Sequence, residues 1–208
     1  MDSTKYIALI GDIVGSRQLP DRANVQIQLE NIFAKVNQKF RETIAANFVI
    51  TIGDEFQGLV HRDFPLKDFL QFFNEHFGHE IATRFGIGLG TLTTALKSEA
   101  IAMDGPCFHQ AREALEFAKE KSLRLAFRGF EMNTAITALF GFLQDLENSW
   151  SARQKEIIEK YSQYQDQATL ARDLQISRQA VFNVLKATNY DQYLLGWDGL
   201  QELFAFRA

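Results

Sequence analysis

The chain has 208 residues, of which 46% are apolar and 12% aromatic, enough for a packed core in one large domain or two small ones. Its net charge of −4 and pI near 5.6 exclude a general electrostatic attraction to nucleic acid or to an anionic membrane. A single cysteine excludes an internal disulfide, and no apolar run approaches the ~20 residues of a membrane span. We therefore expect a cytoplasmic protein with no membrane partner.

Strand and helix patterns alternate through the first 127 residues. Runs of apolar and β-branched residues predict strands at 6–10, 48–52, 56–60, 82–96 and 123–127. Helical spacing of apolar residues predicts helices at 22–45, 66–77 and 106–120. The order β-α-β-β-α-β-α-β predicts an α/β (α+β) fold of the ferredoxin-like, split βαβ type with an additional helix and strand.

The strand pattern at 82–96 carries glycine at three alternate positions, Gly86, Gly88 and Gly90. Glycine at this spacing leaves one face of a strand without side chains, which suits the close approach of another backbone or of a ligand. The sequence leaves both alternatives open.

The patterns after Gly129 are helical only. Residues 134–146 form an apolar helix pattern, and Ser149 or Ser151 is expected to cap the helix that follows. We therefore predict two domains, an α/β domain over residues 1–148 and a small all-α domain over residues 149–208.

Two Gly-Asp pairs follow apolar runs, at Asp12 and at Asp54. If the first and second strands are neighbours, these carboxylates lie close together and repel unless a cation such as Mg²⁺ or Mn²⁺ sits between them. The turn at 14–17 leads toward a helix, so its backbone N–H groups are suited to phosphate. The alternative is ordinary turn and cap chemistry. Glu55 is expected at the exposed hairpin tip, with a third metal carboxylate as its alternative role.

Four segments resemble, in the same order, the motifs of class III nucleotidyl cyclases. They are ALIGDIVGSRQLPDR (8–22), ITIGDEFQGLV (50–60), RFGIGLGTL (84–92) and DGPCFHQAREAL (104–115). The second is also similar to the hairpin of diguanylate cyclases. The whole chain, with its helical tail, most resembles the SatD family.

The cyclase resemblance implies a metal site and a nucleotide site. The metal site would consist of Asp12, the carbonyl of Ile13, and Asp54. The nucleotide would contact Val14, Gly15, Ser16, Arg17, Gly53, His109 and Arg112. The positions that select the base in cyclases hold Ile50 and Ala102, and His109 stands where the family has its catalytic Asn. These departures predict nucleotide and metal binding without useful cyclase activity.

Residues 169–187 show the pattern of a helix-turn-helix. Leu170 and Leu174 lie on one face of a short helix, Gln175 lies in the turn, and Ser177 is an N-cap for a second helix anchored by Val181. Arg172 and Ser177 are expected to contact DNA phosphates. The exposed face of the second helix would read bases through Arg178, Gln179, Phe182, Asn183 and Lys186. The alternative is a protein adaptor.

Taken together, these motifs predict a DNA-binding transcriptional regulator that acts as a homodimer. Its first domain would bind a metal and a nucleotide ligand or serve as a dimerisation platform. The first alternative is a metal-dependent enzyme acting on nucleotide phosphates, and the second is a protein-interaction scaffold.

Overall fold

The computed structural model describes residues 4–19, 21–77 and 81–205. The chain divides into two compact units: unit 1 comprises Met1–Thr137 with Gln201–Ala208, and unit 2 comprises Ala138–Leu200. The division falls inside helix α4 (Asn133–Ser149), whereas the predicted domain boundary lies at the end of that helix.

Unit 1 contains a five-stranded mixed sheet in the order β2-β3-β1-β4-β5. Strand β1 is antiparallel to both of its neighbours, β3 and β4, whereas β5 is parallel to β4. The strands are β1 (Tyr6–Ile13), β2 (Ile44–Ile50), β3 (Phe56–Val60), β4 (Thr83–Gly90) and β5 (Leu125–Arg128). The predicted mixed α/β fold is therefore confirmed.

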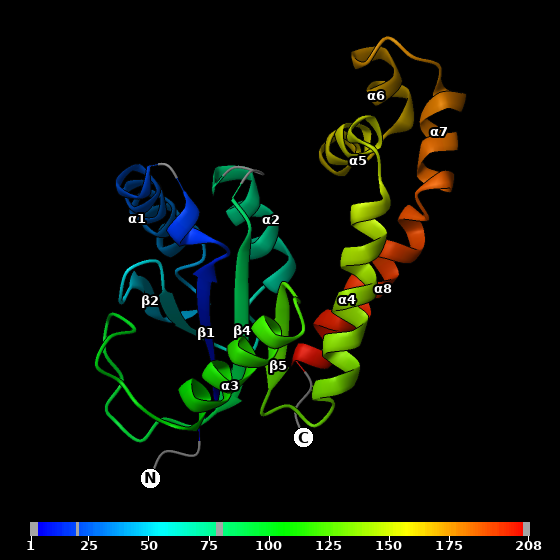
Figure 1. Ribbon diagram of the computed structural model, residues 1–208. Helices are drawn as coiled ribbons and strands as arrows, with labels where there is room; N and C mark the ends of the chain where they lie inside the picture. The colour runs from blue at the N-terminus through cyan, green and yellow to red at the C-terminus, as the bar shows by residue number, and fades with distance from the viewer. Residues whose placement is uncertain (1–3, 20, 78–80, 206–208) are drawn as a thin grey trace. The chain divides into compact units, whose positions relative to one another are not determined.

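Helices cover both faces of this sheet (Figure 1). They are α1 (Arg22–Lys39), α2 (Leu66–Phe77) and α3 (Pro106–Glu120). Aromatic side chains fill the space between the sheet and α1 and α2: Phe33, Phe56, Phe73 and Phe85 contact one another with ring centroids 4.9–5.9 Å apart. The predicted ranges of α2 and α3 agree with the structure, because each helix buries one continuous apolar stripe.

Helix α3 lies directly on the glycine face of β4. A Cβ atom at Gly86 would lie 2.1 Å from the carbonyl oxygen of Ala111, and one at Gly88 would lie 2.1 Å from the amide nitrogen of Ala111. Side chains at these positions would hold the helix away from the sheet. Of the two alternatives for the glycine strand, the structure therefore shows the close approach of another backbone.

Several predicted boundaries are wrong: strand β2 spans Ile44–Ile50 rather than 48–52, and β4 ends at Gly90 rather than at residue 96. Two others are wrong because strand pairing extends beyond them. Helix α1 ends at Lys39 rather than at residue 45, because Ile44 and Ala46 pair with β3. Strand β1 continues to Ile13 rather than ending at residue 10, and Asp12 lies within it, opposite Arg84 of β4.

Unit 2 is helical. It contains most of α4 and α8, together with α5 (Ala152–Tyr164), α6 (Gln167–Asp173) and α7 (Arg178–Ala187); α8 spans Tyr190–Ala205. Ser151 caps α5 in a reciprocal capping box with Gln154, which confirms one of the two predicted caps. The buried indole N–H of Trp150 donates to the carbonyl of Thr188 at 3.1 Å.

A tight turn joins α6 to α7. Gln175 adopts a left-handed conformation with φ of 55°, and the Ser177 hydroxyl accepts a hydrogen bond from the Ala180 amide at 3.0 Å. Ile157, Leu170 and Val181 are buried together beneath this turn. In the described ranges, no helix combines the length and apolarity that crossing a bilayer would require.

Candidate functional site

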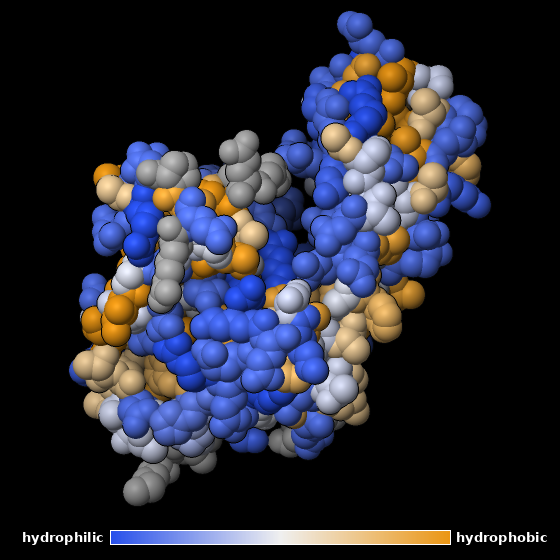
Figure 2. Space-filling view, viewed as in Figure 1, coloured by the Kyte–Doolittle hydropathy of each residue, from blue (hydrophilic) through white to orange (hydrophobic). Residues whose placement is uncertain are grey.

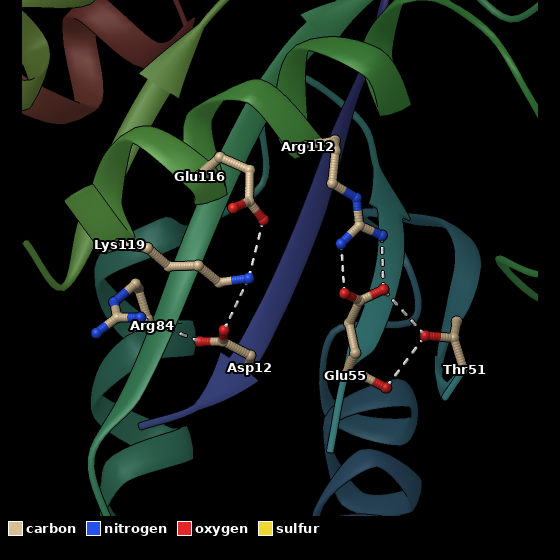
Figure 3. A network of polar contacts seen from close by, with 7 residues as sticks. All are labelled: Asp12, Thr51, Glu55, Arg84, Arg112, Glu116 and Lys119. Atoms are coloured by element: carbon tan, nitrogen blue, oxygen red, sulfur yellow. Dashed lines mark hydrogen bonds and ion pairs between the residues drawn. The ribbon is translucent and has the colours of Figure 1, made fainter. Parts of the chain in front are cut away.

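Asp12 lies near the end of β1, on the face of the sheet that α3 covers. Side chains alternate along a strand, so Asp12 shares this face with Ala8 and Ile10, which pack against α3. Its side chain is 16% exposed. The Oδ2 atom lies 3.2 Å from Nζ of Lys119, and the Oδ1 atom lies 3.9 Å from Nη1 of Arg84 (Figure 3). Oδ1 is buried and accepts no hydrogen bond within the described residues.

Glu55 immediately precedes β3, beside the end of the β1–β3 ladder. The last ladder pair joins Gly11 to Phe56, so Asp12 and Glu55 are the next residues along the two antiparallel strands and share one face. Figure 3 shows Glu55 directed toward Arg112 of α3, whose Nη2 donates to Oε1 at 2.6 Å while Nη1 donates to Oε2. Thr51 supplies a further contact to Oε1, at 3.4 Å.

The prediction that Glu55 is an exposed hairpin tip is therefore wrong. Its side chain is only 22% exposed, whereas Ile52, three residues earlier, is 82% exposed. The strand register carried the missing signal, because the residue before Phe56 must face the same way as Asp12 once Gly11 and Phe56 are paired.

The charges of this site stabilise one another. The hydrogen bond from Arg112 holds the pKa of Glu55 below its ordinary value, and the same bond raises the pKa of Arg112. Burial opposes the charge on Lys119, but hydrogen bonds to Glu116 and Asp12 outweigh it and raise the pKa of Lys119. Near neutral pH Glu55, Arg112 and Lys119 are therefore ionised.

Asp54 lies in a different environment from Asp12. It lines a cavity of about 310 Å³ formed by the hairpin, the turn after β1 and the start of α1. The cavity residues are Ile13, Ser16, Leu19, Arg22, Ala23, Val25, Gln26, Leu29, Gly53 and Asp54. The expected proximity of the two aspartates assumed that the first two strands are neighbours. Strand β3 lies between β1 and β2 instead, so that assumption is wrong.

Some residues of the turn after β1 line the cavity, whereas others are bonded to the sheet or its neighbouring loop. Ser16 and Gly53 line the cavity, and Gly15 has the left-handed φ of 68° that favours glycine. The Val14 N–H donates to the carbonyl of Ala82 at 2.8 Å, so this amide does not belong to a phosphate cradle. Arg17 lies in the short 3₁₀ helix η1 (Ser16–Gln18), and its side chain is outside the described part of the structure.

His109 belongs to the exposed start of α3 rather than to the contacts around Asp12. Its Nε2 lies 2.8 Å from Oδ1 of Asp104, and both side chains are more than half exposed. Asp104 Oδ1 also accepts from the Gly105 amide at 2.8 Å. Of the two predicted nucleotide residues on α3, only Arg112 therefore joins the charged cluster.

The residues predicted to contact DNA all lie on the exposed surface of unit 2. They are Arg172, Ser177, Arg178, Gln179, Phe182, Asn183 and Lys186. Gln179 donates to Asn183 at 2.9 Å, and the Lys186 ammonium lies 5.7 Å from the centre of the Phe182 ring.

A divalent cation would find an incomplete site in this chain. Within the described ranges, no three His, Cys, Asp or Glu side chains come together as a ready-made cation site. A pair of carboxylates with open coordination positions is nevertheless the arrangement that Mg²⁺ uses when phosphate oxygens complete its shell. The buried Oδ1 of Asp12, which accepts no hydrogen bond from the described residues, fits this role.

Unit 1 is thus an α/β domain with a mixed-charge cluster enclosed by two strand ends and α3. The chain belongs to the SatD family, since the family model matches residues 6–203. Two solved structures of a bacterial light-regulated adenylyl cyclase are similar, each with a TM-score of 0.44 over 60% of this chain. Their sequence identities are 16% and 15%, and the matches cover 75% and 43% of those chains. Among curated proteins none matches. Similarity at this level carries no argument about activity.

Proposed function

We propose that unit 1 binds a nucleotide polyphosphate together with a divalent cation and acts on its phosphate groups. The observation that supports this proposal is that Asp12 and Glu55 each stand one residue beyond the last β1–β3 pair, Gly11 with Phe56. One carboxylate oxygen of Asp12 is buried and accepts no hydrogen bond from the described residues. A buried carboxylate oxygen is costly unless a hydrogen bond or a cation compensates it. The Arg84 guanidinium approaches this oxygen only to 3.9 Å, beyond hydrogen-bond distance, and a metal ion would supply closer compensation.

In this proposal Asp12 and Glu55 hold the cation, with the carbonyl of Ile13 as a third oxygen. Both Glu55 oxygens accept from Arg112, so Glu55 would ligate through a remaining lone pair. When bound, Mg²⁺ or Mn²⁺ would neutralise phosphate charge and polarise a phosphoryl oxygen. Asp54 is the alternative second carboxylate, and the cavity that it lines offers room beside the strand ends for part of a nucleotide. Arg112 contributes a planar guanidinium suited to phosphate oxygens.

Base recognition is expected to differ from that of cyclases. Ile50 and Ala102 cannot make the polar contacts that would select a base at the corresponding cyclase positions, and His109 pairs with Asp104. We therefore expect turnover, where present, to be hydrolysis in which water attacks a phosphorus atom. The products would be nucleoside diphosphate and phosphate, or nucleoside monophosphate and pyrophosphate, with no cyclic nucleotide.

Calorimetric titration of Mn²⁺ into the full chain with ATP or GTP tests this proposal. Asp12→Asn and Glu55→Gln should each weaken binding at least about tenfold, the effect of losing one carboxylate ligand (~1.4 kcal/mol). Asp54→Asn decides which second carboxylate the site uses, and Asp63→Asn, an exposed carboxylate after β3, is the matched control.

Phosphate, pyrophosphate and cyclic nucleotide are then measured separately after incubation with each triphosphate. Equal Mn²⁺ binding by wild type and the Asp12→Asn/Glu55→Gln double variant would overturn the metal site. Asp12-dependent formation of a cyclic nucleotide would replace the proposed reaction with cyclisation.

A second proposed function is sequence-specific DNA binding by unit 2, as a transcriptional regulator. It is supported by the exposure of every predicted contact residue and by the Ser177 cap that sets the start of α7. The unit would act as a helix-turn-helix, and a homodimer formed through unit 1 would present two recognition helices, which compensates for weak charge.

Genomic selection followed by mobility shifts at two salt concentrations tests DNA binding. Arg178→Ala or Asn183→Ala should relax sequence preference at single positions, each costing about 1–3 kcal/mol. Lys186→Ala or Arg172→Ala should weaken all sequences alike and flatten the salt dependence. Lys155→Ala, an exposed lysine on α5, is the control. If no site is enriched, unit 2 is an adaptor.

A further inference from the structure

In the charged cluster around Asp12, positive and negative side chains are equal in number. It contains three carboxylates and three cationic groups: Asp12, Glu55, Glu116, Arg84, Arg112 and Lys119. Helix α3 supplies half of the cluster, because residues 112, 116 and 119 recur at helical spacing on one face (Figure 3). The exposed surface over α3 is largely hydrophilic, so the cluster borders solvent (Figure 2).

This charge balance disfavours the binding of a divalent cation alone and of a polyphosphate alone. A divalent cation by itself would add two positive charges beside three cationic side chains. A polyphosphate by itself would add several negative charges beside three carboxylates. Only the two together bring charges that both halves of the cluster can match, because charges of opposite sign then lie beside each new group.

Lys119 is the group able to exchange partners. Its ammonium lies between Asp12 Oδ2, at 3.2 Å, and Glu116 Oε1, at 2.9 Å, and its side chain is 33% exposed. A lysine carries a point charge on a flexible stem, so it can turn from one oxygen to another with little change in geometry. Arg112, by contrast, is held by two parallel hydrogen bonds to Glu55.

We propose that Lys119 pairs with Oδ2 of Asp12 in the absence of ligand and turns to phosphate when a divalent cation binds the Asp12 carboxylate. The cation and the polyphosphate then bind as a coupled pair, and each strengthens the other. This inference rests on the proposed metal site. It adds Lys119 as a phosphate-binding residue and couples the binding of the cation to that of the polyphosphate. Coupling between two ligands is typically about 5- to 150-fold, and we expect at least tenfold.

Variants on either side of the ammonium separate this exchange from simple metal binding. In Lys119→Met, Asp12 loses the nearer of its two cationic partners and keeps Arg84, so Mn²⁺ alone should bind about tenfold more tightly. The Mn²⁺–pyrophosphate complex should bind about tenfold more weakly. In Glu116→Gln, Lys119 turns fully to Asp12, so Mn²⁺ alone should bind more weakly. Lys121→Met is the matched control, since it removes an exposed lysine two residues further along and should behave as wild type.

The experiment is calorimetric titration of the full chain with Mn²⁺, with and without pyrophosphate. Chelation of Mn²⁺ by pyrophosphate in solution is the same for every variant, so the differences between variants report the protein. Circular dichroism melting verifies that each variant folds.

Two outcomes would overturn the proposal in distinguishable ways. If Lys119→Met binds Mn²⁺ alone no more tightly than wild type, or keeps full affinity for the complex, the exchange is refuted. Loss of Mn²⁺ binding in Asp12→Asn would still uphold the metal site in that case. If neither wild type nor Lys119→Met binds Mn²⁺ under either condition, the exchange and the metal site both fail.

Discussion

Replacing Gly86 by alanine tests how α3 is positioned over the sheet. The new Cβ atom would lie 2.1 Å from the Ala111 carbonyl oxygen and 2.3 Å from the Leu115 amide nitrogen. Ordinary contacts begin at 3.4 Å, so the helix must move outward by about 3.4 − 2.1 = 1.3 Å. Both neighbours are backbone atoms, so no side chain can turn aside to relieve the contact.

The expected loss of stability follows from that displacement. Overpacking of a core costs about 1–3 kcal/mol, because surrounding groups leave their preferred positions. For a chain of this size, each kcal/mol lowers the melting temperature by about 2–4 °C, so the expected fall is roughly 2–12 °C. Urea unfolding followed by circular dichroism measures the free energy, and differential scanning calorimetry measures the melting temperature.

The site should be affected with the fold. Arg112 and Lys119 move with α3, so the pairs with Glu55 and Asp12 open, and Mn²⁺ binding changes even in protein that remains folded. Gly141→Ala is the control, because Gly141 lies in α4 and a Cβ atom there would meet nothing within 4 Å. It should be neutral or stabilise by up to about 1 kcal/mol, the difference in helix propensity. A Gly86→Ala protein as stable as wild type would refute the backbone contact between α3 and β4.

Three further predictions concern single groups. Burial raises the pKa of Cys107 to about 11, so the native thiol should resist alkylation at pH 8 and react once urea unfolds the chain; rapid labelling of the native protein would contradict its burial. Arg112 lowers the pKa of Glu55 below 4.5, so the stability from this pair is present above about pH 4.5 and is lost as the pH falls through the folded pKa. The difference in unfolding free energy between wild type and Glu55→Gln should therefore shrink on acidification, and a difference that grows would contradict the lowered pKa. Ser151→Ala removes the capping box of α5 and should cost about 1 kcal/mol in urea unfolding. Ser162→Ala, at a half-buried serine inside α5 that caps no helix, should cost less.

The sequence by itself determined the local features of this protein. The apolar stripes of α2 and α3 and the cap at Ser177 are encoded within a few residues, and the structure confirms them. The alternate glycines of β4 indicated a bare strand face, although they could not show whether a ligand or a backbone covers it. Such features are readable because each depends on neighbours within one or two helical turns or along one strand.

The tertiary structure decided which charges meet. Asp54 and Glu55 are adjacent in sequence. Only the register of β3 against β1, which pairs Gly11 with Phe56, puts Glu55 rather than Asp54 on the same face as Asp12. Lys119 joins the cluster from more than a hundred residues away, because the glycines of β4 let α3 lie close to the sheet. Register and helix seating are long-range properties, set by pairing and packing between distant segments, and a shift of one residue turns every side chain of a strand to the other face.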